Sequence, residues 1–261
     1  MTQAAARSAS FQLREEPPRG TVAAERQHRK SRLAAAYRIF AVKGYDHGLA
    51  GHITARDPEF PDQFWVAPLG PWFGHIRVSD LVRVDHGGNI LEGRGPINQA
   101  GFAIHSAIHR ARPDVIAAAH SHSTFGKAWS ALGRLLDPIS QDSCFLYEDH
   151  VLFRDFSGVV LDTSEGDRIA AALGAKNAAI LQNHGILTLG KSVEGAVSRY
   201  VALENACQTQ LLAEAAGTVK PISQEIARYT AGQSFGAEDP WAFGFRPLWD
   251  RIVREQPDFL E

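Results

Sequence analysis

Residues 101–123, GFAIHSAIHRARPDVIAAAHSHS, decide how this chain folds. From Ile97 to Arg112 apolar residues recur at helical spacing, which predicts a helix with one buried face. Pro113 cannot continue that helix, and the apolar run Val115–Ala119 that follows it is typical of a short buried strand. The strand ends directly in the tripeptide 120–122, His-Ser-His.

Two histidines at i and i+2 of a strand project from the same face, roughly 6.5 Å apart. His120 and His122 can therefore converge on one metal ion, to which each bond is about 2 Å. His184 lies between two apolar runs, in a turn that Asn183 and Gly185 tighten, and is the candidate third ligand. For each residue taken alone, the competing interpretation is a buried histidine that only makes hydrogen bonds. The occurrence of all three as a set favours metal binding over that interpretation.

His105 and His109 are a second pair, spaced i and i+4 on one face of the predicted helix. No carboxylate stands between them and the pattern offers no third ligand. We therefore interpret them as structural residues rather than as a helical metal pair.

Outward from this stretch, helical patterns cover Thr21–Lys43, Phe125–Leu132, Ser164–Leu173 and Val193–Ala216. Short β-rich segments occupy 52–57, 64–68, 81–85 and two runs within 178–189, and residues 135–155 look irregular. This alternation predicts one α/β domain, residues 21–217, with a mixed sheet covered by helices. Residues 1–20 are expected to form a flexible arm, and residues 218–261 a loop-rich tail packed on the body or on a neighbouring subunit.

Composition excludes several classes of function. The 261 residues carry 27 Lys and Arg against 29 Asp and Glu, so no basic field favours nucleic acid or an anionic membrane surface. No apolar run approaches the roughly 20 residues of a membrane span, and the N-terminus has no apolar stretch that could serve as a secretory signal. Two cysteines, Cys144 and Cys207, make no disulfide framework and suit a reducing compartment, so a cytoplasmic location is expected.

Taken together, the segments AGHITARD, WVAPLG, SDLVRVD, GFAIHSAIHRARPDVIAAAHSHS and LQNHGILTLG resemble the class II aldolase/adducin superfamily, in the right order over residues 28–216. The resemblance implies an α/β/α sandwich around a mostly antiparallel sheet. It also implies one divalent metal ion per subunit, held by residues matching His120, His122 and His184, and a homotetramer with the site near a subunit interface.

The chain departs from the aldolases of that family at their acid–base and phosphate-binding positions. Where those enzymes have two serines and a glutamate before the His-x-His, this sequence has Gln99, Ala100 and Gly101. Their other phosphate-contacting positions match Leu49, His52, and Leu69 followed by Gly70. A doubly charged phosphate would be held poorly by such side chains, which makes a sugar phosphate an unexpected substrate.

Several readings of the chemistry stay open. A lyase with zinc or manganese would make or break a carbon–carbon bond next to a carbonyl or carboxylate in a small, non-phosphorylated, apolar or aromatic acid. A non-haem Fe(II) oxygenase, which the sequence also resembles, would decarboxylate an aromatic 2-oxo or 2-hydroxy acid oxidatively. An adducin-like binding protein without catalysis is the third hypothesis.

A proton carrier must replace the missing glutamate if the protein is a lyase. His52 titrates in the useful range and is the first candidate. Asp142 and Tyr147 are weaker candidates, because a capping or surface role explains each of them as well. Asp142 or Glu148 is also a possible fourth metal ligand.

Overall fold

The computed structural model describes residues 19–159, 163–233 and 237–261, so the predicted arm of residues 1–20 lies almost wholly outside the described part. Eight strands form one mixed sheet in the order β4-β3-β2-β1-β5-β8-β7-β6. All neighbouring strands are antiparallel except β6 and β7, which are parallel. The strands are β1 His52–Arg56, β2 Gln63–Val66, β3 Val82–Asp85, β4 Ile90–Glu92, β5 Ala117–Ser121, β6 His150–Phe153, β7 Ala178–Leu181 and β8 Gly185–Gly190.

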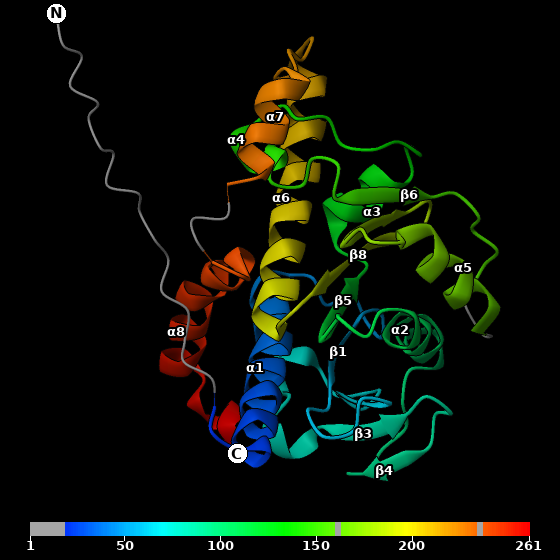
Figure 1. The fold of residues 1–261 in the computed structure, drawn as a ribbon, viewed down its shortest axis with the longest axis vertical. Coiled ribbons are helices and arrows are strands. Elements are labelled where there is room, and N and C mark those ends of the chain that lie inside the picture. The colour runs from blue at the N-terminus through cyan, green and yellow to red at the C-terminus, as the bar shows by residue number, and fades with distance from the viewer. Residues whose placement is uncertain (1–18, 160–162, 234–236) are drawn as a thin grey trace, which may run out of the picture.

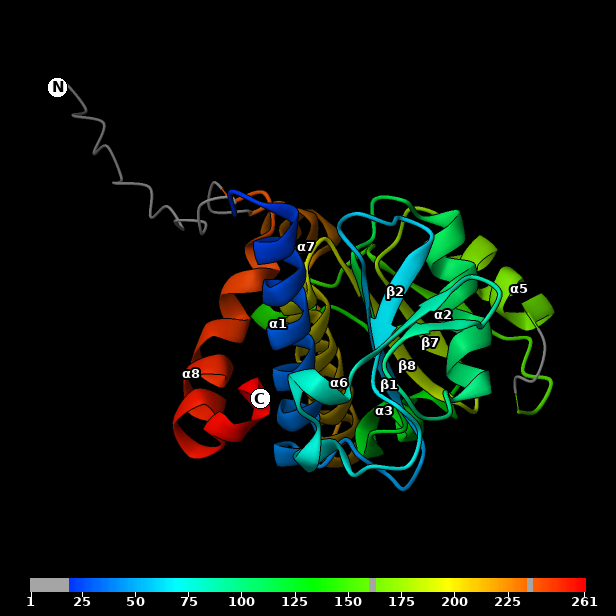
Figure 2. The same cartoon turned by 90° about the horizontal axis from the view of Figure 1, so that it is seen from below.

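Helices cover both faces of this sheet (Figures 1 and 2), which confirms the predicted layered α/β fold. The long helices α1 and α6 pack on one face, and α2 and α5 pack on the other. The α-helices are α1 Val22–Val42, α2 Gln99–Ala111, α3 Thr124–Ser130, α4 Gln141–Cys144, α5 Thr163–Leu173, α6 Val193–Ala216, α7 Gln224–Ala231 and α8 Arg246–Glu255. Short 3-10 helices are η1 Phe73–His75, η2 Val78–Asp80, η3 Pro240–Phe245 and η4 Pro257–Leu260.

Strand alternation divides the core into two layers. Ile53 of β1 and Ala119 of β5 face α1 and α6, whereas Ala118 of β5 and Leu187 of β8 face α2 and α5. His52, Thr54 and His120 have the parity of Ala118, so their side chains point to the α2 side of the sheet. This parity brings the polar residues of three elements into one layer.

The C-terminal segment differs from the prediction of a loop-rich tail, because most of residues 218–261 are helical. Helix α8 packs outside α1, and Phe245, Ile252 and Phe259 join the core beneath it (Figure 2). Three of the four prolines in this segment, Pro240, Pro247 and Pro257, stand at the first or second positions of η3, α8 and η4, where a helix does not need the missing N–H. Proline therefore starts these helices instead of breaking them.

Residues 135–155 were also expected to be irregular, and they contain α4 and the edge strand β6. Strand β6 has only four residues, and its burial does not alternate from one residue to the next. A pattern search for a half-buried strand misses such a segment, because pairing with β7 rather than its own periodicity makes it a strand.

No helix in the described ranges is both long and apolar enough to cross a lipid bilayer.

Candidate metal centre

Strand β5 delivers the first two histidines of the site. His120 is the fourth residue of β5 and is fully buried, and His122 follows the last residue of the strand and is half-buried. Their rings are 5.2 Å apart between centroids, as two side chains at i and i+2 on one face should be.

His184 comes from the turn that joins β7 to β8, between Leu181 and Gly185. Asn183 adopts a left-handed backbone with φ of 60°, a conformation that asparagine tolerates better than most residues. A Cβ on Gly185 would lie 2.9 Å from the carbonyl oxygen of Ser121 and 3.4 Å from the His120 ring. Only glycine lets this turn approach β5 closely enough to place His184 beside the other two rings.

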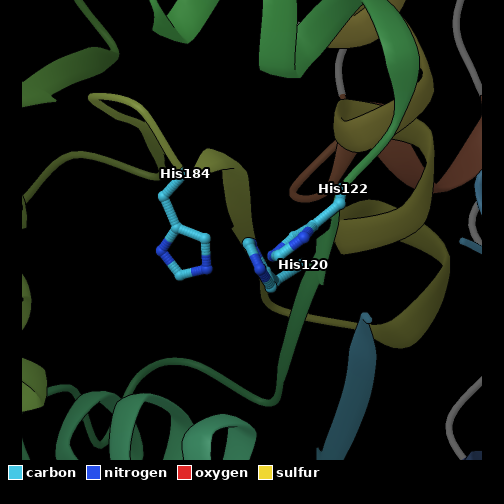
Figure 3. Close-up of side chains that lie close together, drawn as sticks. All are labelled: His120, His122 and His184. Carbon is cyan, nitrogen blue, oxygen red and sulfur yellow. The ribbon is translucent and has the colours of Figure 1, made fainter. Parts of the chain in front are cut away.

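The three imidazoles face a common point (Figure 3), and their ligating nitrogens all lie within 4.8 Å of one another. His120 Nδ1 is 2.8 Å from the carbonyl oxygen of Ile186, to which it donates a hydrogen bond as a neutral ring, so Nε2 is left for an ion. Two nitrogens bound to one ion at about 2 Å lie at most about 4 Å apart, so modest ring rotations complete the set. The geometry fits a three-histidine metal site.

Electrostatics also favour a cation here. Burial holds the pKa of His120 well below 6.5, and the neighbouring His184 and His52 lower it further. Burial, together with His122, lowers the pKa of His184 to about 4, and burial lowers that of His122 as well. All three rings are therefore neutral near pH 7, which is the protonation state that binds a metal ion.

A buried network holds the loop that carries His122. The Glu204 carboxylate accepts hydrogen bonds from Ser123 Oγ at 2.6 Å and from the backbone N–H groups of Phe125 and Gly126 at 2.9 and 2.6 Å. The carboxylate thus sits at the N-terminus of α3, where the helix dipole favours negative charge. Tyr200 donates to the Ser121 carbonyl from the same helix α6. The sequence analysis missed these residues, since nothing local marks α6 as the partner of this loop.

Within the described residues, no Asp or Glu carboxylate joins the three-histidine group. Glu148, a possible fourth ligand, is ion-paired with Arg228 at the surface, 2.7 Å away. Asp142 lines a separate cavity between α4, α6 and η3, and the Tyr147 ring lies 5.8 Å from the Arg228 guanidinium. The structure thus does not bring these three candidates to the histidines, because α4 packs on α6 and α7 instead (Figure 1).

His52 is the candidate that the structure does place at the site. It lies directly opposite His120 in the β1–β5 pairing, with ring centroids 4.9 Å apart. A Cβ on Gly101 would be 2.3 Å from His52 Cδ2, so the ring occupies the space in which a side chain at position 101 would begin. A side chain at position 101 and the present position of the His52 ring therefore exclude one another.

Four of the five substrate-binding candidates, Leu49, Leu69, Gly70 and Gly101, line one pocket with His52, together with Phe73 and Phe102. Gln99 does not line it and is exposed at the start of α2. Phe156 was not singled out from the sequence; its ring is 6.3 Å from that of His184 and is 45% exposed. It comes from an irregular segment that no motif marks. The pocket is lined mostly by apolar residues, and its polar lining side chains are those of His52, Tyr37, Thr54 and Asn98.

A mixed sheet between helices, with three histidines at the end of β5 and in the β7–β8 turn, is a fold of the class II aldolase type. Residues 31–211 match the family described as Class II Aldolase and Adducin N-terminal domain, and the chain belongs to that family.

Individual relatives are similar over nearly the whole chain. The protein is 42% identical to the 4-hydroxy-3-prenylphenylpyruvate oxygenase/4-hydroxy-3-prenylbenzoate synthase of Streptomyces roseochromogenus subsp. oscitans, over 94% of this chain and 89% of that one. It is also 42% identical to Decarboxylase NovR of Streptomyces niveus, over 94% and 92% of the two chains. Among solved structures, L-fuculose 1-phosphate aldolase from Glaciozyma antarctica PI12 superposes with a TM-score of 0.87 at 45% identity, over 95% of this chain and 97% of that one.

Proposed function

We propose that the protein is a metal-dependent enzyme that makes or breaks a carbon–carbon bond next to a carbonyl or carboxylate in a small, non-phosphorylated, aromatic or apolar acid. The observation that carries the proposal is the convergence of three neutral imidazoles beside an apolar pocket. His120, His122 and His184 would hold one divalent ion per subunit, zinc, manganese or Fe(II). Such an ion, when bound, supplies Lewis acidity toward a substrate oxygen.

The pocket residues select the substrate. Leu49 and Leu69 offer no hydrogen-bond donor to a phosphate, and Phe73 and Phe102 present apolar surface suited to an aromatic ring. His52 is proposed to contact the substrate and to pass on, as a neutral ring, the proton that a glutamate carries in the aldolases. The expectation that His52 titrates in the useful range is wrong, because burial, together with the neighbouring His105, holds its pKa well below 6.5. The names of the two Streptomyces relatives, an oxygenase of a prenylated phenylpyruvate and a decarboxylase, support an aromatic acid.

A second candidate is oxidative decarboxylation of an aromatic 2-oxo or 2-hydroxy acid with Fe(II). The oxygenase named among the relatives favours it, and a three-histidine set suits iron as well as zinc.

The sugar-phosphate activity named for the Glaciozyma structure, despite its 45% identity, is disfavoured. Gly101 leaves the acid–base carboxylate out, and a glutamate placed there would collide with His52. A non-catalytic, adducin-like binding role is disfavoured by the complete histidine set. We also propose a homotetramer, as is common in the family, which sedimentation equilibrium would test.

Elemental analysis of protein purified without oxygen is the decisive experiment. About one zinc or manganese per chain, with turnover of aryl 2-oxo or 2-hydroxy acids in the absence of oxygen, supports the lyase. About one iron per chain, with substrate-dependent oxygen uptake, supports the oxygenase instead. No metal after reconstitution with each of the three ions would overturn both and leave the binding protein.

A further inference from the structure

Behind His52 runs an unbroken hydrogen-bonded chain of three histidines and one threonine. His52 Nδ1 lies 2.8 Å from His105 Nε2, and His105 Nδ1 lies 2.8 Å from Thr54 Oγ1. The same hydroxyl lies 2.9 Å from His109 Nε2. The chain leads from the pocket wall into the layer between the sheet and α2.

Two periodicities assemble the chain. His52 and Thr54 stand at i and i+2 of β1 and share the face toward α2. His105 and His109 stand at i and i+4 of α2 and share the face toward the sheet. Because the strand and the helix pack together, the four side chains alternate in space although they lie 51 to 55 residues apart in pairs.

The chain is buried and uncharged. His52 is 6% exposed, and the other three residues are exposed by 2% or less. Burial holds the pKa values of His52, His105 and His109 well below 6.5, and the Arg56 guanidinium, which donates to the His109 carbonyl oxygen at 2.6 Å, adds to this effect at His109. Each imidazole therefore carries one hydrogen and has one donor and one acceptor nitrogen.

Two arrangements of hydrogen atoms satisfy every polar group of the chain around Thr54. Among the described residues only His105 and His109 lie within hydrogen-bond distance of the Thr54 hydroxyl, so its one hydrogen is bonded only if it donates to one of these rings, and it then accepts from the other. If it donates to His105, all three rings carry hydrogen on Nε2. If it donates to His109, all three rings carry hydrogen on Nδ1. A mixed state either breaks one of the three bonds or makes Thr54 accept from both rings, which leaves its buried hydrogen without an acceptor.

We propose that His105, Thr54 and His109 are positioning residues for His52, which fix its ring orientation and set whether its Nε2 meets the substrate as a donor or as an acceptor. With Nδ1 engaged by His105, Nε2 lies on the opposite side of the imidazole, the side left for the pocket that His52 lines. Contact with His120 on one side and the backbone of Gly101 on the other limits rotation of the ring.

Packing α2 against β1 does not by itself require a chain of hydrogen-bonded polar side chains, because apolar side chains could fill the same space. Replacing a satisfied buried hydrogen-bonded pair by apolar groups of the same shape is often close to neutral for stability. The four hydrogen-bonded side chains have a property that leucine or phenylalanine would lack. The tautomer of His109 fixes which nitrogen is donor and which is acceptor in each following ring, as far as His52 at the pocket. The inference rests on the proposed role of His52 in contacting the substrate, but the arrangement of hydrogens is measurable without any substrate.

Nitrogen-15 NMR of the histidine side chains in the full-length, zinc-loaded protein at pH 7.5 tests the proposal. We expect His52, His105 and His109 to share one tautomer, whichever of the two it is. Thr54→Val removes the linking hydroxyl, so the tautomer of His109 should no longer be tied to that of His105. Thr54→Ser keeps a hydroxyl and should retain the shared tautomer. Different tautomers among the three rings of the unmodified protein would overturn the proposal, and this measurement needs no variant to fold.

Kinetics provide the second readout. Thr54→Val should lower kcat roughly 10- to 100-fold at unchanged zinc content, as removal of an orienting partner typically does, and Thr54→Ser should recover most of it. A wild-type kcat in Thr54→Val would also overturn the positioning role. If neither the unmodified protein nor the variants turn over any aryl acid, the proposed function is wrong. The shared tautomer is tested separately, because the NMR spectra need no substrate.

Discussion

Two sets of histidines lie next to each other on one side of the sheet, and they satisfy their nitrogen atoms in opposite ways. His120, His122 and His184 turn nitrogens toward a shared point, and within the described part of the chain the one hydrogen bond of their rings runs from His120 to the Ile186 carbonyl oxygen. His105 and His109 spend theirs on Thr54 and His52 within the core. The first set is poised to bind a ligand, whereas the second forms hydrogen bonds within the protein through every side-chain nitrogen except His109 Nδ1. His52 touches both and is the link between them.

The largest expected effect comes from removing a residue of the first set. His184→Ala should lower the affinity for zinc at least about 100-fold, because one of three ligands is lost. The free energy of unfolding of the metal-free protein should change by less than about 1 kcal/mol, since the side chain is only half-buried in a turn. Isothermal titration calorimetry and urea unfolding measure the two quantities.

His75→Ala is the matched control, because His75 is exposed and lies outside the set. Zinc binding by His184→Ala with the affinity of the unmodified protein would show that the three rings do not form one site.

Removing a residue of the second set should have the converse result. His105→Ala leaves a cavity and strands hydrogen-bonding groups of His52 and Thr54, so we expect the free energy of unfolding to fall by about 2–4 kcal/mol. Zinc stoichiometry should stay at that of the unmodified protein. If His105→Ala instead lost zinc at an unchanged free energy of unfolding, His105 would behave as a metal ligand, and the two sets of histidines would not differ in role.

A third variant tests how closely the link residue is fitted. A Cβ on Gly101 would lie 2.3 to 2.8 Å from three atoms of the His52 ring, so Gly101→Ala should destabilise by about 1–3 kcal/mol despite the better helix propensity of alanine. In the background of His52→Ala the same substitution should cost much less. A double-mutant cycle by urea unfolding measures the coupling, and strictly additive effects would contradict the close contact.

The extent to which the sequence predicts these sets depends on how local their signals are. His120 and His122 are two residues apart at the end of a short apolar run, which predicts that both project from one face of a strand. Asn183 and Gly185 mark the turn that carries His184. These local signals allowed the three histidines to be grouped from the sequence alone. The helices Val193–Ala216 and Ser164–Leu173 were predicted almost to the residue, because caps and apolar periodicity define them locally.

The link to Thr54 could not be predicted in this way. His105 and His109 were expected to be structural rather than metal ligands, and both are buried and hydrogen-bonded, but their partners come from strand β1 and depend on how α2 lies across it. The distance of Asp142 and Tyr147 from the three histidines could not be predicted for the same reason, since only tertiary packing places α4 against α6 and α7. The Glu204 carboxylate caps α3 from the middle of α6, and no motif near Glu204 or near α3 predicts this contact.

The smallest expected effect concerns pH and distinguishes the buried chain from exposed histidines. The pKa values of His105 and His109 are lowered by burial well below the value of about 6.5 expected in the unfolded chain, so below that pH the unfolded state binds more protons. Stability is therefore greatest above pH 6.5 and falls as the pH drops. Between pH 7.5 and 5.5 each such histidine should contribute about 1.4 kcal/mol to that loss.

A variant that lacks one of the two rings should lose correspondingly less stability over this range. His109→Gln keeps a polar side chain near Thr54, and its free energy of unfolding, although lower at pH 7.5, should fall about 1.4 kcal/mol less than that of the unmodified protein by pH 5.5. His75→Gln, at an exposed site, should retain the slope of the unmodified protein. Parallel pH profiles for His109→Gln and the unmodified protein would mean that folding leaves the pKa of His109 at its unfolded value, and His109 would then not belong to an uncharged buried chain.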